Sequence, residues 1–153
     1  MDEQNDATDG PLRYDANIAE DERTPFVPLC LMMNCRSICN KADNLMEIMN
    51  QICPDLILAS ETWEREKMRL KDILKCRKFK SVSYYRKNRS PGGGCAIIFN
   101  EERFRSADAD IIVPDGVEAV WSVFTPVAGS TQNMKVKRIA VGSIYISPKS
   151  KFN

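Results

Sequence analysis

Two apolar runs that each end on a polar residue constrain the fold of this chain most. Residues 29–33 lead to Asn34, and residues 56–59 lead through Ser60 to Glu61. Neither run alternates apolar with polar residues, which is typical of strands buried on both faces in the middle of a parallel sheet. A short helix between them makes a right-handed strand–helix–strand unit with parallel strands. We therefore expect Asn34 and Glu61 at the carboxyl edge of one sheet, where ligands bind.

The length and composition indicate one domain in a reducing compartment. The 153 residues include no apolar stretch long enough for a membrane span and no basic-then-apolar secretion signal at the start. We therefore expect an intracellular protein, in the nucleus or the cytoplasm, with no membrane partner. The six cysteines form no Cys-x-x-Cys pair, so reduced thiols in or near the core are expected. Without a histidine, a structural zinc site is not expected.

The net charge of +1 conceals two oppositely charged segments. Residues 1–23 carry eight acidic and two basic side chains, so we expect residues 1–25 to form a flexible acidic leader ahead of a partial domain over residues 26–153. Residues 65–89 carry eleven Lys or Arg against two acidic side chains. That density suits a polyanionic partner such as nucleic acid, but a solvated helix face explains it equally well.

The remaining pattern predicts a mixed β-sheet with flanking helices, an α/β fold. One helix follows Asn40 as N-cap and is stopped by Pro54, and a second is expected over residues 63–76. Strands are expected over residues 81–85, 95–99, 103–106, 117–124 and 136–146, with a glycine loop over residues 86–94. A sheet of about seven strands with two helices leaves one face uncovered, so self-association through that face is expected.

Asn34 and Glu61 are the candidate metal ligands. A carboxylate at the end of a buried strand is costly unless it is paired, hydrogen-bonded or bound to a cation. The tips of adjacent strands lie about 4.8 Å apart, so the two side chains can address one ion. One carboxylate with one amide suits Mg²⁺ (or Mn²⁺), which keeps most of its waters and takes substrate phosphate. The alternative is that both side chains only cap a turn and the helix that follows.

Four segments occur in the order and spacing of one protein family. They are Met-Asn-Cys-Arg-Ser at 33–37, Pro-Asp-Leu-Ile-Leu-Ala-Ser-Glu-Thr-Trp at 54–63, Arg-Ser-Pro-Gly-Gly-Gly-Cys-Ala-Ile at 89–97 and Tyr-Ile-Ser-Pro at 145–148. Together they resemble the amino-terminal half of an endonuclease/exonuclease/phosphatase domain, most like the endonuclease of non-LTR retrotransposons. The resemblance implies half of the four-layer α/β sandwich of the deoxyribonuclease-like superfamily.

The resemblance also implies roles for single residues. Asn34 matches the active-site asparagine of the family, Glu61 its magnesium-binding glutamate, and Tyr145 the tyrosine that contacts the scissile phosphate. A metal and neutral donors at these places stabilise the charge that develops on the phosphoryl oxygens. Without the resemblance, Tyr145 reads as a packing residue of a strand. Arg86 and Arg89 beside the glycine loop either contact nucleic-acid phosphates or are simply solvated.

The chain departs from the family pattern in two ways: one residue differs near Tyr145, and two residue pairs of the family are missing. Ser147 stands where the family usually has a proline, and the family's Asp-x-Asn pair would lie beyond residue 153, while its Asp-His pair needs a histidine that the sequence lacks. We therefore expect a fragment of a magnesium-dependent phosphodiesterase that nicks DNA, inactive alone. The alternatives are a remnant that binds nucleic acid without catalysis, and a phosphatase acting on phospholipid headgroups or nucleotides.

Overall fold

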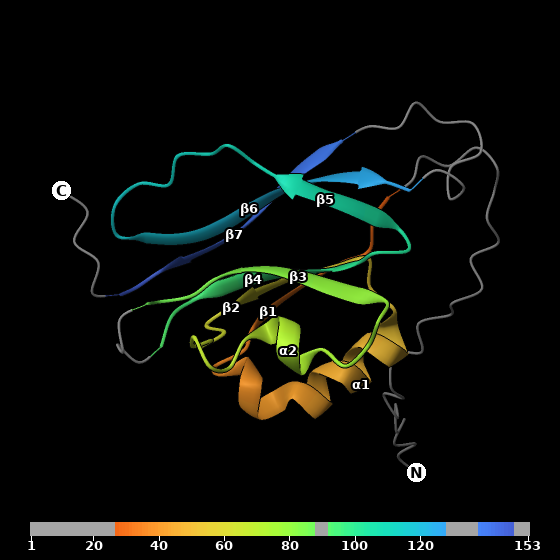
Figure 1. Ribbon diagram of the computed structural model, residues 1–153, viewed down its shortest axis with the longest axis horizontal. Coiled ribbons are helices and arrows are strands. Elements are labelled where there is room, and N and C mark those ends of the chain that lie inside the picture. The colour runs from red at the N-terminus through yellow and green to blue at the C-terminus, as the bar shows by residue number, and fades with distance from the viewer. Residues whose placement is uncertain (1–26, 88–91, 128–137, 149–153) are drawn as a thin grey trace, which may run out of the picture.

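The computed structural model describes residues 27–87, 92–127 and 138–148 (Figure 1). The acidic leader predicted over residues 1–25 and the candidate residue Arg89 lie outside these ranges. The elements follow the order β1 (Cys30–Asn34), η1 (Ile38–Lys41, a 3₁₀ turn), α1 (Ala42–Ile52), β2 (Leu56–Ser60), α2 (Leu70–Ile73), β3 (Phe79–Tyr84), β4 (Cys95–Asn100), β5 (Phe104–Asp108), β6 (Val117–Pro126) and β7 (Ile139–Ile146).

The strands divide into two stacked sheets, which the sequence pattern did not reveal. The first has the order β1-β2-β4-β3, with β1 parallel to β2 and β4 antiparallel to both of its neighbours. The second has the order β5-β6-β7 and is antiparallel throughout. Figure 1 shows the second sheet on one face of the first and the helices on the other. The mixed α/β class is confirmed, and β6 and β7 pack on β2, β3 and β4 on the face opposite the helices.

The core between the sheets is built around three phenylalanines. The ring of Phe124 from β6 meets the ring of Phe99 from β4 edge-on, at a centroid distance of 5.2 Å. It meets Phe104 from β5 in the same manner at 6.0 Å. Phe104 and Phe124 are fully buried, and each such side chain contributes roughly 1.5–3 kcal/mol by leaving water. These contacts fix the second sheet over β4.

β1 is an edge strand, and the prediction that it is buried on both faces was wrong. Its residues alternate between exposed and half-buried, whereas β2 is largely buried and fits the prediction. Leu31 and Met33 pack against the helix-side core. Met32 points to the other face and is 77% exposed. A continuous apolar run therefore does not by itself place a strand in the middle of a sheet.

The first predicted helix is present, with a different start. α1 begins at Ala42 after η1, and Lys41 occupies the N-cap without a side-chain hydrogen bond, so Asn40 is not the cap. Leu45 and Met49 are buried, and the helix ends before Pro54. The sequence thus predicted the existence and the end of this helix, but not its first residue.

The second predicted helix, over residues 63–76, was wrong except for the single turn of α2. The buried carboxylate of Glu64 accepts a hydrogen bond from the backbone N–H of Leu70 at 2.5 Å. Between them, Arg65 and Met68 pair with each other across a tight turn. A side chain that captures a backbone N–H in this way competes with helix formation.

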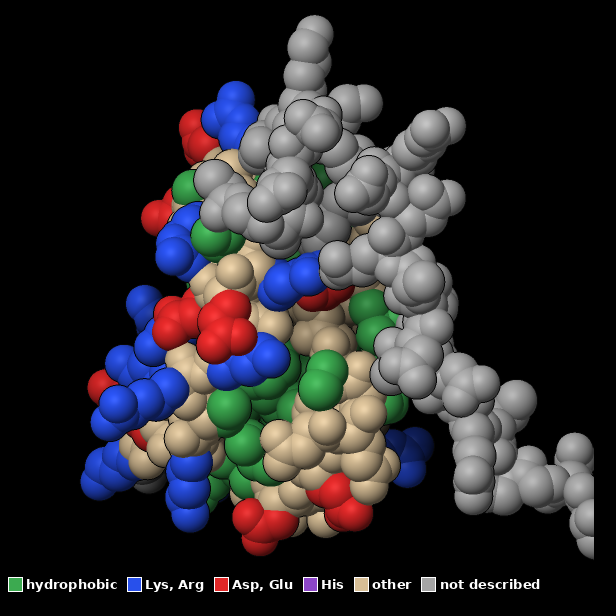
Figure 2. All heavy atoms as spheres, turned by 90° about the vertical axis from the view of Figure 1, so that its right-hand side faces the viewer, with side chains coloured by type: hydrophobic (Ala, Val, Ile, Leu, Met, Phe, Trp, Pro, Cys, Tyr) green, Lys and Arg blue, Asp and Glu red, His purple; other side chains and the backbone are tan. Residues whose placement is uncertain are grey.

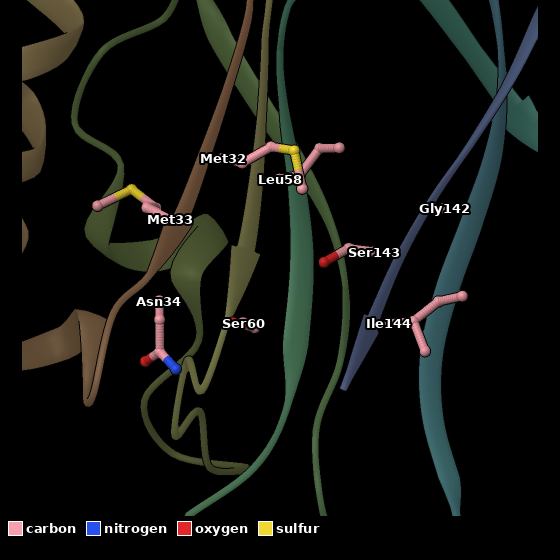
Figure 3. A pocket seen from close by; sticks show the side chains of 8 residues that line it. All are labelled: Met32, Met33, Asn34, Leu58, Ser60, Gly142, Ser143 and Ile144. Atoms are coloured by element: carbon pink, nitrogen blue, oxygen red, sulfur yellow. The ribbon is translucent and has the colours of Figure 1, made fainter. Parts of the chain in front are cut away.

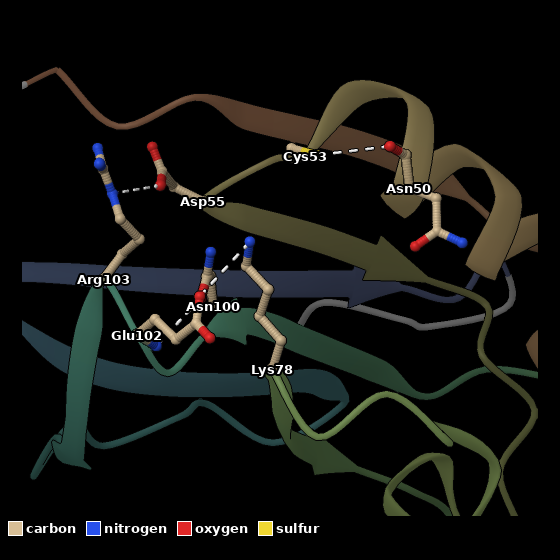
Figure 4. Close-up of polar contacts among 7 residues, drawn as sticks. All are labelled: Asn50, Cys53, Asp55, Lys78, Asn100, Glu102 and Arg103. Carbon is tan, nitrogen blue, oxygen red and sulfur yellow. Dashed lines mark hydrogen bonds and ion pairs between the residues drawn. The ribbon is translucent and has the colours of Figure 1, made fainter.

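Asp55, at the amino-terminal end of β2, accepts hydrogen bonds from three other parts of the chain (Figure 4). Its side chain accepts hydrogen bonds from the Leu29 N–H at 2.9 Å and from Nε of Arg103 at 3.1 Å. Its backbone carbonyl accepts a third hydrogen bond from the Asn100 N–H at 3.0 Å.

Figure 2 looks onto this end of the molecule, with Lys and Arg side chains gathered along one side. No helix in the described ranges is long and apolar enough to cross a membrane.

Candidate active site

The strand ends converge at the opposite edge of the sandwich, on the left of Figure 1. β1, β2, β3 and β7 end there, and β4 and β6 begin there, because antiparallel neighbours reverse the direction of the chain. Both sheets therefore contribute side chains to one edge.

Asn34 and Glu61 lie at this edge, as the parallel strand pair predicted. Asn34 pairs with Ser60 at the end of the ladder. Backbone hydrogen bonds continue past the strands, from Ser37 N–H to the Glu61 carbonyl and from Ile38 N–H to the Thr62 carbonyl, both at 3.0 Å. The segments that follow the two strands thus stay in register and hold the two candidate ligands side by side.

The backbone around the two candidates is strained. Five non-glycine residues in the described ranges have a positive φ, and four of them lie here: Arg36 (41°), Ser37 (77°), Glu61 (51°) and Trp63 (55°). Such conformations are uncommon outside glycine and persist only where the surroundings enforce them. Here the hydrogen bonds between the two segments enforce them. Backbone strain of this kind accumulates at functional sites.

The side chains of Glu61 and Asn34 leave oxygen atoms available. Glu61 is half-buried, and its carboxylate makes no hydrogen bond or ion pair with any residue in the described ranges. Asn34 is exposed, and its Oδ1 accepts a hydrogen bond from the Arg36 N–H at 3.3 Å. Across the same ranges, no three His, Cys, Asp or Glu side chains come together to hold a metal. One carboxylate and one amide oxygen fit Mg²⁺, which binds few protein ligands and keeps its waters.

A cavity of about 300 Å³ opens between β1, β2 and β7 beside Asn34 (Figure 3). Its lining comprises Met32, Met33, Asn34, Leu58, Ser60, Gly142, Ser143 and Ile144. The hydroxyl of Ser143 donates a hydrogen bond to the Ala59 carbonyl at 2.9 Å, which ties β7 to β2. Glu61 and Tyr145 do not line this cavity.

Tyr145 comes to the same edge from the second sheet. It lies two residues beyond Ser143 on the same face of β7, which is about 6–7 Å further along the strand. It pairs in register with Glu118 of β6 and is half-buried. The three residues predicted for the site therefore share one edge, with Tyr145 across the interface between the sheets.

Glu118 is an interface residue that the sequence prediction missed. Its carboxylate accepts hydrogen bonds from the Gly94 N–H and from Nε of Arg86, both at 2.5 Å. The guanidinium of Arg86, expected either to contact phosphate or to be solvated, is thus bound to a carboxylate of the other sheet. A lone carboxylate in the apolar run of residues 117–124 was the available signal, because a buried charge needs a partner.

The glycine loop connects Glu118 to the Glu61 segment. The Gly94 carbonyl accepts a hydrogen bond from the Thr62 N–H at 3.3 Å, and the Gly93 carbonyl accepts one from the Trp63 N–H at 3.0 Å. Both glycines have a positive φ, and a Cβ on Gly93 would lie 2.5 Å from Oε2 of Glu118. Only glycine permits this approach.

Burial raises the pKa of the two thiols nearest the site. Burial raises the pKa of Cys95 to about 12, and the negative charge of Glu118 adds to the effect. Burial also raises the pKa of Cys35 to about 11, against an opposing effect of Lys41. Both thiols remain protonated near pH 7, and the thiolate is the reactive form.

Comparison with known proteins identifies the fold. No family model and no curated protein matches the chain, but solved structures do. A 3′ phosphatase from Neisseria, solved with a product DNA hairpin, matches with a TM-score of 0.51 at 15% identity, over 74% of this chain and 40% of its own. The AP endonuclease of Leishmania major matches with 0.53 at 12% identity, over 82% and 46%. The chain therefore shares the fold of these two solved structures.

The human Nocturnin catalytic domain matches as well, with a TM-score of 0.50 at 12% identity, over 80% of this chain and 51% of its own. The chain thus spans about half the length of these structural neighbours or less. At such identities the likeness extends to the fold alone.

Proposed function

We propose that Asn34, Glu61 and Tyr145 form part of a magnesium-dependent phosphodiesterase site of the kind with which retrotransposon endonucleases nick DNA. The observation that carries the proposal is the Glu61 carboxylate, which has no partner in the described ranges and sits on strained backbone beside Asn34. The superfamily fold, shared with a phosphatase and an AP endonuclease, supports hydrolytic phosphate chemistry.

Each residue has a role that suits its chemistry. Glu61 and Asn34 would hold Mg²⁺ or Mn²⁺ through their oxygen atoms. The cation supplies positive charge where the phosphoryl oxygens become more negative. The Tyr145 phenol would donate a hydrogen bond to a phosphate oxygen, and the Asn34 amide N–H would donate another.

We propose that the chain binds a divalent cation and DNA but turns over negligibly by itself. The sequence has no histidine. Among the described residues, the candidate site offers no second carboxylate as a base for the attacking water, since Glu118 is engaged with Arg86 and Gly94. We also propose that the protein lies inside the cell, in the nucleus or the cytoplasm, where DNA would be available as a substrate.

Manganese binding tests the ligand assignment. Titration of the protein with Mn²⁺, followed by electron paramagnetic resonance of the free ion, should show one site that Glu61→Gln weakens at least about tenfold, because the loss of one charged ligand costs more than about 1.4 kcal/mol. The matched control is Glu66→Gln, which removes an exposed carboxylate five residues away. Equal affinity in wild type and Glu61→Gln would remove Glu61 from the site.

Nicking of supercoiled plasmid tests the catalytic part separately. With Mg²⁺ at neutral pH the chain should relax no more plasmid than buffer does. Robust nicking that Glu61→Gln abolishes would confirm the site and overturn the proposed inactivity. Nicking that survives Glu61→Gln would point to a contaminating nuclease or to another site.

Exposed basic side chains favour a second candidate, a module that only binds nucleic acid. Four basic residues of the stretch 65–89 lie near carboxylates: Arg69, Lys78, Lys80 and Arg86. Six others are exposed: Arg65, Lys67, Lys71, Lys75, Arg77 and Lys87. This candidate predicts DNA binding that weakens steeply with salt and does not change when EDTA is added. Binding that depends on the cation favours the phosphodiesterase proposal instead.

A further inference from the structure

Trp63 places an exposed aromatic ring beside the candidate active site. It lies two residues beyond Glu61, and 39% of its surface is exposed. Among the described residues its indole N–H donates no hydrogen bond, and its ring forms no aromatic or cation–π pair. A tryptophan normally buries its large apolar surface and pairs its N–H. Part of this ring, together with its N–H, is therefore available to a ligand.

The residues on either side of Trp63 impose this exposure. Thr62 and Glu64 are both buried, and the Glu64 carboxylate holds the Leu70 N–H at 2.5 Å. The backbone N–H of Trp63 donates to the Gly93 carbonyl at 3.0 Å, and its φ of 55° is rare for a bulky residue. The chain thus holds the ring outward on strained backbone. Strain of this kind is typical of a side chain that serves binding rather than packing.

A second exposed aromatic residue, Tyr84, lies across Gly94 from Trp63. Tyr84 ends β3 and is 42% exposed. A Cβ on Gly94 would lie 3.2 Å from the Tyr84 carbonyl oxygen and 3.7 Å from the Trp63 backbone nitrogen. Trp63 and Tyr84 are the most exposed aromatic residues of the described ranges. The candidate site therefore has two free aromatic side chains beside it.

Positive charge follows each of these aromatic residues along the chain. Arg65 and Lys67 come after Trp63 on the tight turn and are exposed, with Glu66 as the carboxylate of that turn. A single nucleic-acid strand matches such a surface, because it presents flat base faces together with phosphate charges. In a duplex the base faces are covered by their neighbours in the stack, so a side chain reaches them only where a base is unpaired.

We propose that Trp63 stacks on an unpaired base of a DNA strand bound at this edge, so that the site prefers single-stranded to double-stranded DNA. The exposed basic side chains contact the phosphates, and Tyr84 offers a second aromatic face to a neighbouring base. The proposal rests on the proposed function only in taking DNA as the ligand of this edge. It adds the kind of strand that the site receives.

Tryptophan fluorescence tests the contact directly. The chain has two tryptophans, so the Trp121→Phe variant reports on Trp63 alone. Titration of this variant with a short oligothymidylate in EDTA should quench its emission, because the bases stack on the indole. A blunt GC-rich duplex should quench it far less. In the Trp63→Phe variant, where Trp121 is the remaining reporter, oligothymidylate should cause no comparable change.

Substitutions at Trp63 separate stacking from packing. Trp63→Leu keeps an apolar side chain but has no aromatic face. In fluorescence anisotropy it should weaken oligothymidylate binding at least about fivefold and duplex binding by less than about twofold. Trp63→Phe retains an aromatic face and should stay within about threefold of wild type. The charge control is Lys67→Gln, which should weaken both ligands alike because both carry phosphates.

Any of three results would overturn the proposal. They are emission of Trp63 that oligothymidylate leaves unchanged, wild-type affinity for oligothymidylate in Trp63→Leu, and equal losses for single strand and duplex in that variant. If near-ultraviolet circular dichroism shows that Trp63→Leu is unfolded, the quenching of Trp63 in the Trp121→Phe variant decides alone. Because these measurements are made in EDTA, their outcome is independent of whether Glu61 holds a cation. A Mn²⁺ site that depends on Glu61 would likewise stand if Trp63 bound no base.

Discussion

The carboxylate of Glu118 accepts a hydrogen bond from the backbone N–H of Gly94 at 2.5 Å, and this bond joins the second sheet to the loop that holds the Glu61 segment. The same carboxylate binds Arg86. Removing one member of a buried ion pair lowers the free energy of unfolding by several kcal/mol. The edge where Asn34, Glu61 and Tyr145 meet therefore depends on Glu118. Glu118 itself has no role in the reaction proposed for this edge.

Glu118→Gln should lower the free energy of unfolding by about 2–4 kcal/mol, because the buried ion pair between Glu118 and Arg86 would be lost. Urea unfolding followed by tryptophan fluorescence measures the change. Glu102→Gln provides the control, since its ion pair with Lys78 is exposed at 3.5 Å and should change stability by less than about 1 kcal/mol. Equal losses in the two variants would contradict a structural role of Glu118.

Gly94→Ala should be more destabilising than Gly116→Ala. Both glycines have a φ of +81°, so an alanine costs about 1–2 kcal/mol at either position. At Gly94 the new Cβ would also lie 2.7 Å from Oγ1 of Thr62, whereas at Gly116 nothing lies within 4 Å. The crowding should add about 1–3 kcal/mol at Gly94, measured by urea unfolding. Equal costs would mean that the loop moves away from Thr62.

Glu61→Gly should be more stable than Glu61→Ala by about 1 kcal/mol, while both should lose the proposed cation site. Glu61 has a φ of 51°, a conformation that glycine adopts without strain and alanine does not. Thermal unfolding of the two variants gives the difference in stability, and Mn²⁺ titration gives the binding. An alanine variant as stable as the glycine variant would show that the backbone relaxes at this position.

Stability should fall as the pH rises above 9. The Cys95 thiol has an ordinary pKa of 9.0 in the unfolded chain and a pKa raised to about 12 in the folded protein. The unfolded chain therefore releases the proton first, and folding loses up to about 1.4 kcal/mol per pH unit between pH 9 and 12. Urea unfolding of wild type and Cys95→Ala at pH 8 and pH 10 isolates this loss, with Cys53→Ala as the exposed control. A parallel decline in all three proteins would assign it to other groups.

Local sequence patterns predicted the strands well and the second helix poorly. The strand positions hold within a few residues, because alternating and apolar runs depend on neighbours in the chain. The parallel pairing of β1 and β2 also follows from local rules, since one helix connects them. The helix over residues 63–76 failed because Glu64 binds the Leu70 N–H. The Glu64 side chain competes with the helix for this N–H only because its carboxylate is buried. The spacing of apolar residues does not show which carboxylates are buried.

The sequence by itself determined which residues end the first two strands, and therefore that Asn34 and Glu61 meet at one edge. Only the tertiary structure decided that the strands divide into two sheets, that β1 is an exposed edge, and that Glu118 binds the glycine loop 24 residues away along the chain. These features depend on the register and stacking of segments far apart in sequence. Pairing at that distance is fixed by which apolar faces and buried charges satisfy one another, and the local pattern of side chains does not contain that information.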